Sequence, residues 1–203
     1  MSKKPIIVFE GIEGSGKSHH IMNVSNYLKK KRIDHIKIRE PGGSVNSEKI
    51  RKLILDSKSN FNKHTDLLLY LAARSENINL LKRYYKKKII LIDRFIDSTI
   101  AYQHYGLGVN LKLINFVNEH LLKNFNIDFT FLNIVNKDNM TRRLKLRKKL
   151  NRYDKFNKNF YAKVQRGFLK IANNNINKYQ IINSNLNINQ NEEKIIQKID
   201  RLL

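Results

Sequence analysis

A glycine-rich stretch directly after a short apolar run constrains the fold of this chain more than any other feature. Residues 11–18 read Gly-Ile-Glu-Gly-Ser-Gly-Lys-Ser, which matches the pattern G-x-x-x-x-G-K-[ST] of a phosphate-binding loop. The apolar residues 6–9 precede it, and a segment typical of a helix follows from Lys17 to about Lys31. Such a loop binds phosphate between a buried strand and a helix, where backbone N–H groups point at the anion. The flanks therefore strengthen the prediction of a nucleoside triphosphate site.

The residue types of the loop suit separate tasks in holding a triphosphate. The glycines let the backbone pass close to phosphate oxygens, because no Cβ stands in the way. The Lys17 ammonium is expected to reach the β- and γ-phosphates, and the Ser18 hydroxyl to bind Mg²⁺. The alternative is a glycine-rich turn that binds nothing, which the flanks disfavour. The predicted triphosphate-binding residues are Gly11, Ile12, Glu13, Gly14, Ser15, Gly16, Lys17 and Ser18.

Length and composition favour a single globular domain. The chain has 203 residues and is 41% hydrophobic, which is enough to bury a substantial core. It contains no cysteine, which excludes disulfides and thiolate metal sites and favours an intracellular setting. No apolar stretch is long enough to span a bilayer. We therefore expect residues 1–203 to form one domain in the cytoplasm, without a membrane partner.

The net charge of +23 is compatible with two kinds of partner. A charge of this size is often found in proteins that bind nucleic acid, because neutralising phosphates releases counterions. Here the basic residues are spread along the chain, and Asn, Ile and Lys are abundant together, which indicates a general bias in residue usage. The pattern favours solvated basic faces that attract anionic substrates over a nucleic-acid partner.

Short apolar runs alternate with segments of helical periodicity. Strands are expected at 5–9, 35–39, 89–92, 129–134 and 179–182. Helix faces are expected from Ile50, Leu53 and Ile54, from Leu113, Ile114, Val117 and Leu121, and from Ile195, Ile196, Ile199 and Leu202. The Asn-rich residues 173–191 are interpreted as a loop with one short strand inside. This alternation predicts an α/β fold with a parallel sheet, whose ligands bind at the carboxyl ends of the strands.

Three of these strand ends carry polar residues suited to phosphate chemistry. Asp93 ends a buried strand and is expected to assist in binding Mg²⁺, the alternative being a carboxylate that caps a helix near Ser98. Arg94 beside it indicates an anion, because an arginine is unusual at a buried strand end. Arg39 and Arg51 are further candidates, since arginine pairs with phosphate through two hydrogen bonds. Taken singly, each arginine could instead form a surface ion pair.

Three separated motifs together resemble those of the thymidylate kinase family. They are FEGIEGSGKS at 9–18, REPGG at 39–43 and DRFIDSTIAYQ at 93–103, in the order in which that family has them. The second and third are distinctive of the family. The resemblance implies a P-loop nucleoside monophosphate kinase architecture, with a five-stranded parallel sheet and helices on both faces. It also implies a homodimer, and transfer of the γ-phosphoryl group of ATP to dTMP with Mg²⁺.

The resemblance assigns residues to the sugar and phosphate of dTMP. Glu13 matches the acidic residue that contacts the 3′-hydroxyl of the sugar. Arg39, Arg51 and Arg94 match the arginines around the phosphate group. Tyr102 matches the tyrosine whose ring lies beneath the sugar and leaves no room for a 2′-hydroxyl.

The resemblance also assigns residues to the thymine base. Tyr70 falls where the family has an aromatic ring that stacks on the base, and Arg74 where it has a hydrogen-bonding arginine. The spacing of four places both on one face of a helix. Thr99 and Gln103 match further polar contacts on the base side. Without the resemblance, Tyr70 would be interpreted as a core residue of an apolar helix.

The densely basic residues at about 142–156 resemble the lid of family members that have no arginine in the phosphate loop. This chain has Gly14 and Ser15 in the loop, so the resemblance implies that the lid supplies the catalytic arginine. Residues 151–154 read Asn-Arg-Tyr-Asp, and Arg152 is the first candidate, followed by Arg143 and Arg147. Lys17, Arg94 and Arg152 are thus the expected catalytic residues.

Two departures from the family pattern bear on efficiency. Leu107 stands where many members have arginine, and Phe95 replaces the commoner tyrosine or histidine. Two other functions are alternatives: a related kinase with another acceptor, such as a deoxynucleoside, and a P-loop ATPase acting on nucleic acid. Arg39 and Arg94 favour an acceptor that already carries a phosphate.

Overall fold

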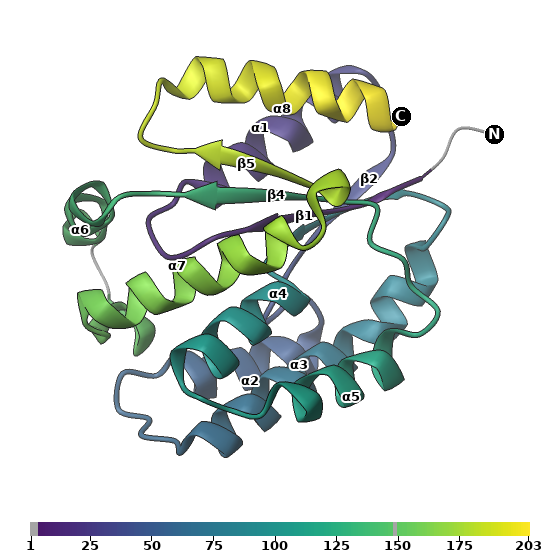
Figure 1. The fold of residues 1–203 in the computed structure, drawn as a ribbon. Helices are drawn as coiled ribbons and strands as arrows, with labels where there is room; N and C mark the ends of the chain where they lie inside the picture. The colour runs from purple at the N-terminus through teal and green to yellow at the C-terminus, as the bar shows by residue number, and fades with distance from the viewer. Residues whose placement is uncertain (1–3, 148–149) are drawn as a thin grey trace.

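The computed structural model describes residues 4–147 and 150–203 and has five parallel strands at its centre (Figure 1). The strands are β1 (Ile6–Glu10), β2 (His35–Arg39), β3 (Ile89–Asp93), β4 (Phe129–Ile134) and β5 (Tyr179–Asn183). Their order across the sheet is β2-β3-β1-β4-β5. The predicted strands are confirmed to within one residue at each end. β1 and the apolar part of β3 are buried, as expected of central strands covered on both faces.

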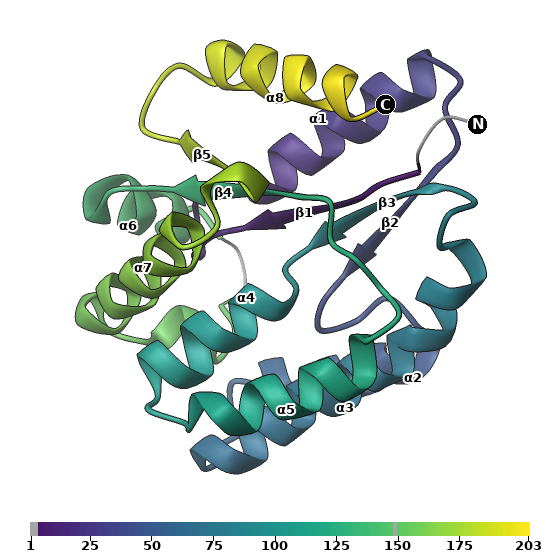
Figure 2. The ribbon, with the colours of Figure 1, turned by 45° about the vertical axis from the view of Figure 1, so that its right-hand side comes forward.

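Helices cover both faces of this sheet. Helices α1 (Lys17–Lys30) and α8 (Ile188–Leu202) lie side by side on one face (Figure 2). The other face is covered by α2 (Val45–Leu55), α3 (Lys63–Tyr84), α4 (Ile96–Thr99), η1 (Ile100–Gly106), α5 (Leu111–Leu122) and α7 (Lys158–Asn173). Helix α6 (Lys137–Lys145) lies beyond the carboxyl ends of the strands, and two short 3₁₀-helices, η2 (Tyr153–Lys155) and η3 (Ile176–Lys178), flank α7.

The side chains of β1 divide the core into two layers. Ile7 and Phe9 pack with α1 and α8, whereas Ile6 and Val8 pack with residues of β3, α3 and α5. This division follows from the strand period of two, which sends successive side chains to opposite faces. The doubly covered sheet that results is the expected fold class.

The sequence-based faces of two outer helices were partly wrong. Leu53 on α2 and Leu113 on α5 are exposed, whereas their neighbours Ile54 and Ile114 are fully buried. Both helices belong to the layer farthest from α1 and α8, so only a narrow stripe of each contacts other elements. A helix covered on one side needs a narrower apolar stripe than the sequence offers.

Asparagine side chains begin five of the helices. The side-chain oxygens of Asn62, Asn110, Asn136, Asn157 and Asn187 accept hydrogen bonds from backbone N–H groups of the first turns of α3, α5, α6, α7 and α8. This residue type suits the N-cap because its short side chain satisfies an otherwise unpaired donor. The predicted loop at 173–191 therefore ends early, since α8 begins at Ile188 directly after its cap.

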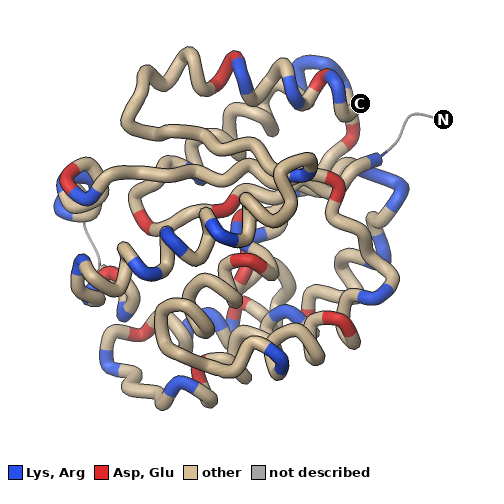
Figure 3. Tube along the Cα trace, in the orientation of Figure 1, with Lys and Arg blue, Asp and Glu red and all other residues tan. Residues whose placement is uncertain are grey.

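Basic residues are spread over both helical layers, as their distribution in the sequence predicts (Figure 3). None of the helices in the described ranges is both long and apolar enough to cross a membrane.

Candidate active site

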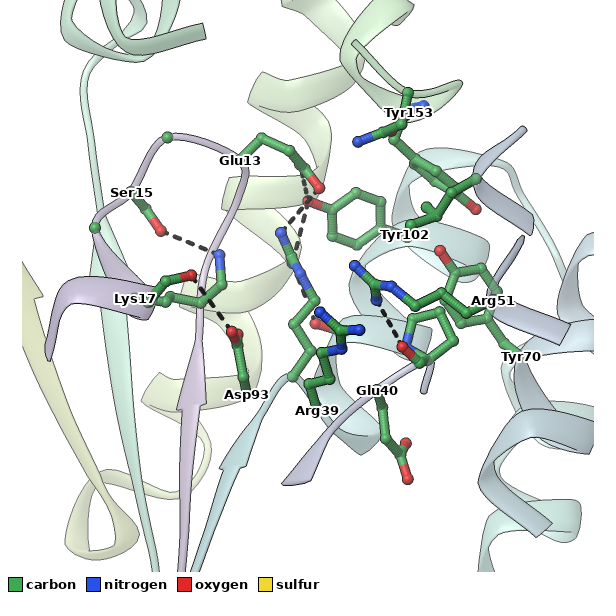
Figure 4. Close-up of a pocket in the computed structure, with 18 of the residues that line it drawn as sticks. Glu13, Ser15, Lys17, Arg39, Glu40, Arg51, Tyr70, Asp93, Tyr102 and Tyr153 are labelled. Carbon is green, nitrogen blue, oxygen red and sulfur yellow. Dashed lines mark hydrogen bonds and ion pairs between the residues drawn. The ribbon is translucent and has the colours of Figure 1, made fainter. Parts of the chain in front are cut away.

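A cavity of about 250 Å³ opens where β1, β2 and β3 end (Figure 4). The three polar clusters predicted at strand ends converge here, as the parallel sheet requires. Segments 13–19, 39–41, 51–55, 93–103 and 151–153 contribute lining residues, as does Arg147. The cavity lies between the phosphate loop on one side and α3 on the other.

The phosphate loop wraps around the ammonium group of Lys17. The Lys17 Nζ donates to the carbonyl oxygens of Gly11 and Ile12, each at 2.8 Å. Burial, and then the charge of Arg94, lower the pKa of Lys17 to about 7. Gly11 is required at its position, because a Cβ there would lie 2.2 Å from the backbone oxygen of Asn133. The loop thus presents a buried cation that a bound anion would stabilise in its charged form.

Ser18 and Asp93 face each other across the amino end of α1. The Ser18 Oγ lies 3.4 Å from the Asp93 Oδ2. A hydroxyl and a carboxylate oxygen at the edge of a phosphate loop are the hard ligands that Mg²⁺ prefers. The residues present therefore fit a magnesium ion.

Glu10 has the helix-capping role that was the alternative for Asp93. Its Oε1 accepts from the backbone N–H groups of Phe95 and Ser98, at 2.7 and 3.2 Å. Burial and the neighbouring Asp97 raise the pKa of Glu10 to about 7. The capping role of Glu10 was not predicted from the sequence. A carboxylate at the end of a fully apolar strand could have indicated a buried role of this kind. Asp93 is thereby left free to face Ser18.

Glu13, Arg94 and Tyr102 form a hydrogen-bonded cluster beside the loop. The Arg94 Nη2 lies 2.8 Å from the Glu13 Oε1, and the Tyr102 hydroxyl donates to the same carboxylate. Burial opposes ionisation of Glu13, but Arg94 and Lys17 outweigh it and lower the pKa of that carboxyl. Arg94 has a φ of 65°, a conformation that non-glycine residues adopt rarely and mainly at functional sites. The predicted sugar and phosphate ligands are thus brought together.

Arg39 and Arg51 line the opposite wall of the cavity. The Arg51 Nη1 donates to the backbone oxygen of Pro41 at 2.6 Å, which directs its guanidinium toward the cavity. Arg39 is exposed and pairs with Glu48 at 2.9 Å. It therefore has both the position expected of a phosphate ligand and the surface ion pair that was its alternative.

Tyr70 also lines the cavity, and its ring packs edge-on to Tyr153 with 6.0 Å between ring centroids. It is only partly buried. Tyr70 therefore packs against the hydrophobic core and also lines the cavity. Gln103 lines the same end of the cavity from the π-helix η1, a distortion that is frequent at functional sites.

Two predicted base ligands lie behind the cavity wall. Among the described residues, neither Arg74 nor Thr99 lines the cavity. Arg74 is 1% exposed, and its guanidinium pairs with Glu40 at 2.8 Å and donates to Asn118 at 2.7 Å. The Arg74 side chain reaches Glu40, directly after β2, instead of the cavity, because the buried Glu40 carboxylate needs a cation. The guanidinium also stacks on the ring of Phe95 at 5.0 Å, so this departure from the family pattern has a packing role.

The three lid arginines have different partners. Arg143 donates to the backbone oxygens of Gly14 and Ser184, at 2.8 and 2.7 Å. Arg147 lines the cavity and pairs with Asp154 at 2.5 Å. Arg152 is not among the described lining residues and pairs with the buried Asp66 of α3. Arg152, which is expected to close over the transferred group, is held against α3 by Asp66 in this structure. Lys148 and Lys149 of the predicted lid lie outside the described residues.

His19, His20 and Glu192 form a second group of potential metal ligands, next to the loop. Their donor atoms lie within 4.8 Å of one another. Two ligand atoms that each lie 2.1 Å from one ion are at most about 4.2 Å apart. Donor atoms that are merely within 4.8 Å of one another therefore do not establish a coordination site. The His19 Nε2 lies 2.5 Å from the Glu192 Oε1, a short His–Glu contact between α1 and α8.

A phosphate loop with arginines across a shared cavity, at the carboxyl edge of a five-stranded parallel sheet, defines a P-loop nucleoside monophosphate kinase. The sequence model of the thymidylate kinase family matches residues 9–195. The chain belongs to the thymidylate kinase family.

Individual relatives agree over nearly the whole chain. A thymidylate kinase of Staphylococcus epidermidis is 35% identical over 200 residues, covering 97% of this chain and 98% of the relative. One of Mycoplasma capricolum is 36% identical over 189 residues, covering 91% and 89%. The crystal structure of thymidylate kinase from Ehrlichia chaffeensis superimposes with a TM-score of 0.77 at 30% identity, covering 97% of this chain and 98% of that one.

Proposed function

We propose that this protein transfers the γ-phosphoryl group of ATP to dTMP, giving ADP and dTDP, with Mg²⁺ as cofactor. One observation carries the proposal: the phosphate loop and the Glu13–Arg94–Tyr102 cluster border the same cavity. A donor triphosphate on the loop would therefore face an acceptor held by the arginines. Membership of the thymidylate kinase family supports dTMP as that acceptor.

On the donor side, residues 11–18 would bind the triphosphate of ATP. Lys17 supplies positive charge next to the β- and γ-phosphates, and burial makes that charge effective. Ser18 and Asp93 would hold Mg²⁺, which neutralises charge on the phosphate oxygens when bound. The requirement for Mg²⁺ rests on this donor set and on the family.

On the acceptor side, the arginines and the Glu13–Arg94–Tyr102 cluster would bind different parts of the nucleoside monophosphate. Arg39, Arg51 and Arg94 would hold its phosphate, because their guanidinium groups pair with phosphate through two hydrogen bonds. Glu13 would accept a hydrogen bond from the sugar 3′-hydroxyl, above the ring of Tyr102.

The base would lie between the side chains at the other end of the cavity. Tyr70 and Gln103 line that end and would contact the base directly. Arg74 and Thr99 would act from behind the wall. Arg74 does so by fixing Glu40, which follows β2 directly and precedes Pro41 on the cavity wall.

The protein has little covalent chemistry to perform, so catalysis rests on position and charge. Lys17 and Arg94 flank the path of the transferred group. Of the lid arginines, we assign the cation nearest the phosphates to Arg147, because it lines the cavity. Arg143 would order the loop through the Gly14 oxygen. Closure of the lid over residues 142–156 would also exclude water, a competing acceptor.

A panel of acceptors tests the proposal. Purified protein with ATP and Mg²⁺ is given dTMP, thymidine, other monophosphates or DNA, and ADP release is followed. Turnover is expected with dTMP and to be lost in Lys17→Met. Preference for thymidine would indicate a deoxynucleoside kinase, and DNA-stimulated release of phosphate would indicate an ATPase. Either result would overturn the proposal.

The proposed assembly is a homodimer of single-domain subunits, each spanning residues 1–203. Exposed apolar side chains on two packed helices support it, namely Leu68 of α3 and Leu113 and Phe116 of α5. Side chains of this kind, such as Phe116 at 71% exposure, are typical of surfaces that a partner covers. We propose the cytoplasm as the location, because its charged substrates do not cross membranes unaided.

A further inference from the structure

A buried carboxylate behind the cavity connects three parts of the molecule. Asp66, in the first turn of α3, is 2% exposed. Its Oδ2 accepts from the Tyr153 hydroxyl at 2.5 Å and from the Gln103 Nε2 at 3.1 Å. Its Oδ1 accepts from the Arg152 guanidinium. The two lid residues and the cavity residue Gln103 thus share one anion.

This anion determines which way the Gln103 amide faces. An ionised carboxylate can only accept hydrogen bonds, so the NH₂ group of Gln103 must be the part that meets Asp66. The carbonyl oxygen of Gln103 is then the remaining polar group. It is buried and has no hydrogen-bond partner within the described part of the chain. Gln103 is itself 0% exposed and lines the cavity. A buried acceptor without a partner is costly, and a donor on a bound ligand that reached this oxygen would remove that cost.

The same anion holds the lid residues down against α3. The Arg152 guanidinium lies over the rings of Phe61 and Tyr153, at 5.3 and 5.0 Å from their centroids. The backbone N–H of Arg152 also donates to the Leu55 oxygen at 3.3 Å. Burial acts to lower the pKa of Arg152, but the hydrogen bond to Asp66 outweighs it and raises that pKa. The lid is therefore tied to α3 through a charge that water screens only weakly.

We propose that Asp66 is a positioning residue that couples closure of the lid to selection of the acceptor base. It holds Gln103 so that a carbonyl oxygen, and not an NH₂ group, faces the acceptor, and it holds Arg152 and Tyr153 of the lid through the same carboxylate. The inference rests on the proposed function, since it assumes a nucleoside monophosphate in this cavity.

The hydrogen-bonding groups of the pyrimidine bases determine the consequence for specificity. Thymine and uracil carry an N–H donor at N3, whereas cytosine has an acceptor at N3. A fixed Gln103 oxygen pairs with thymine and uracil and repels cytosine. Asp66 thereby selects the class of base without touching it.

The substitution Asp66→Asn tests this coupling. The side-chain amide that it introduces can donate to Gln103, so the Gln103 side chain is expected to turn its NH₂ group toward the acceptor. The ratio of kcat/KM for dTMP to kcat/KM for dCMP should then fall about tenfold or more, the worth of one exchanged hydrogen bond. Asp34→Asn is the matched control, because Asp34 is exposed, pairs with Lys88 at 3.5 Å and precedes β2 at its amino end. It should leave the ratio unchanged.

The contact between Asp66 and Arg152 of the lid is tested by its effect on kcat. Arg152→Met should lower kcat and should also lower the dTMP/dCMP ratio, by less than Asp66→Asn does, because it frees one oxygen of the Asp66 carboxylate but leaves Gln103 paired with the other. Its effect on kcat should be smaller in the Asp66→Asn background than alone, since the two residues act through one contact. Additive effects would overturn the coupling.

The outcomes separate this inference from the proposed function. Wild-type protein that does not phosphorylate dTMP refutes the proposed function. Wild-type activity with equal losses for dTMP and dCMP in Asp66→Asn means that Asp66 serves stability alone.

If Asp66→Asn does not fold, NMR of the wild type decides. The side-chain NH₂ protons of Gln103 should exchange with water far more slowly than those of the exposed Gln190, with and without dTMP. Equal exchange would overturn the proposal.

Discussion

The charged side chains of the cavity are held in their ionisation states by one another. Burial raises the pKa of a carboxyl and lowers that of an ammonium, and both effects occur here, at Glu10 and at Lys17. Glu13 stays ionised because Arg94 and Lys17 outweigh its burial. A bound ion changes the pKa values of these groups. Substrate binding should therefore be accompanied by uptake or release of protons.

Proton uptake on ATP binding is the first expectation. Lys17 has a pKa of about 7 in the free protein, so at pH 8 it is largely neutral. A bound triphosphate favours the charged form, so binding at pH 8 should take up a proton, and ATP affinity should fall as pH rises above about 7. Calorimetry in buffers of different ionisation enthalpy measures the uptake. Lys17→Met should lack the Lys17 part of it, while titration of ATP itself is common to both proteins. Identical uptake would contradict a titrating Lys17.

The Arg74–Glu40 pair gives a second expectation. Arg74→Met should lower the free energy of unfolding by about 3–5 kcal/mol, because it leaves Glu40 buried without its cation. Adding Glu40→Gln should recover part of that loss. Denaturant unfolding measures both variants. A direct base contact would instead predict a raised KM for dTMP at unchanged stability.

Among the elements, the π-helix η1 and α7 approach each other unusually closely. A Cβ on Gly106 of η1 would lie 2.7 Å from the Phe160 ring, and one on Gly167 of α7 would lie 2.5 Å from the Tyr105 ring. An aromatic ring of the opposite helix thus packs against each glycine. This packing sets the position of η1, which carries Tyr102 and Gln103 into the cavity.

Gly167→Ala should therefore affect both stability and substrate binding. The added methyl group must displace Tyr105, which should cost about 1–3 kcal/mol of unfolding free energy. The shift of η1 should also raise KM for dTMP more than KM for ATP. Thermal unfolding and steady-state kinetics check the two effects. Lys163→Ala, on the exposed side of α7, is the control and should change neither. An unchanged KM for dTMP would mean that η1 does not depend on α7.

For the molecule as a whole, charge and exposed apolar surface act in opposite directions on association. A net charge of +23 spread over both layers disfavours contact between copies at low salt. The apolar side chains on α3 and α5 favour it. A dimer through these helices should therefore tighten as salt screens the charge.

Phe116→Glu should convert the proposed dimer to a monomer. Sedimentation of wild type and variant over a salt series measures the change, which should amount to at least about tenfold in dissociation constant, the effect of removing one large buried side chain. Ile176→Glu is the control, because Ile176 is equally exposed but lies on η3, away from α3 and α5. A monomeric wild type, or equal effects of both variants, would contradict this interface.

Local pattern was enough for the framework of this protein. The five strands, the phosphate loop and its helix were predictable to within a residue or so, because burial periodicity and glycine placement act over short stretches of chain. The convergence of three strand ends followed from parallel topology alone. Most of the proposed phosphate and sugar ligands, such as Lys17 and Arg94, lie where the motifs placed them.

Only the tertiary structure determined which partners the long charged side chains have. Arg74 pairs with Glu40, 34 residues away, and Arg152 with Asp66, 86 residues away, and neither pairing has a signature along the chain. Glu10 and Asp93 end neighbouring strands alike, yet one caps a helix and the other faces Ser18. A buried charge binds whichever opposite charge the fold brings nearest, because leaving it unpaired costs several kcal/mol. That choice depends on distances between segments far apart in sequence, which motifs do not encode.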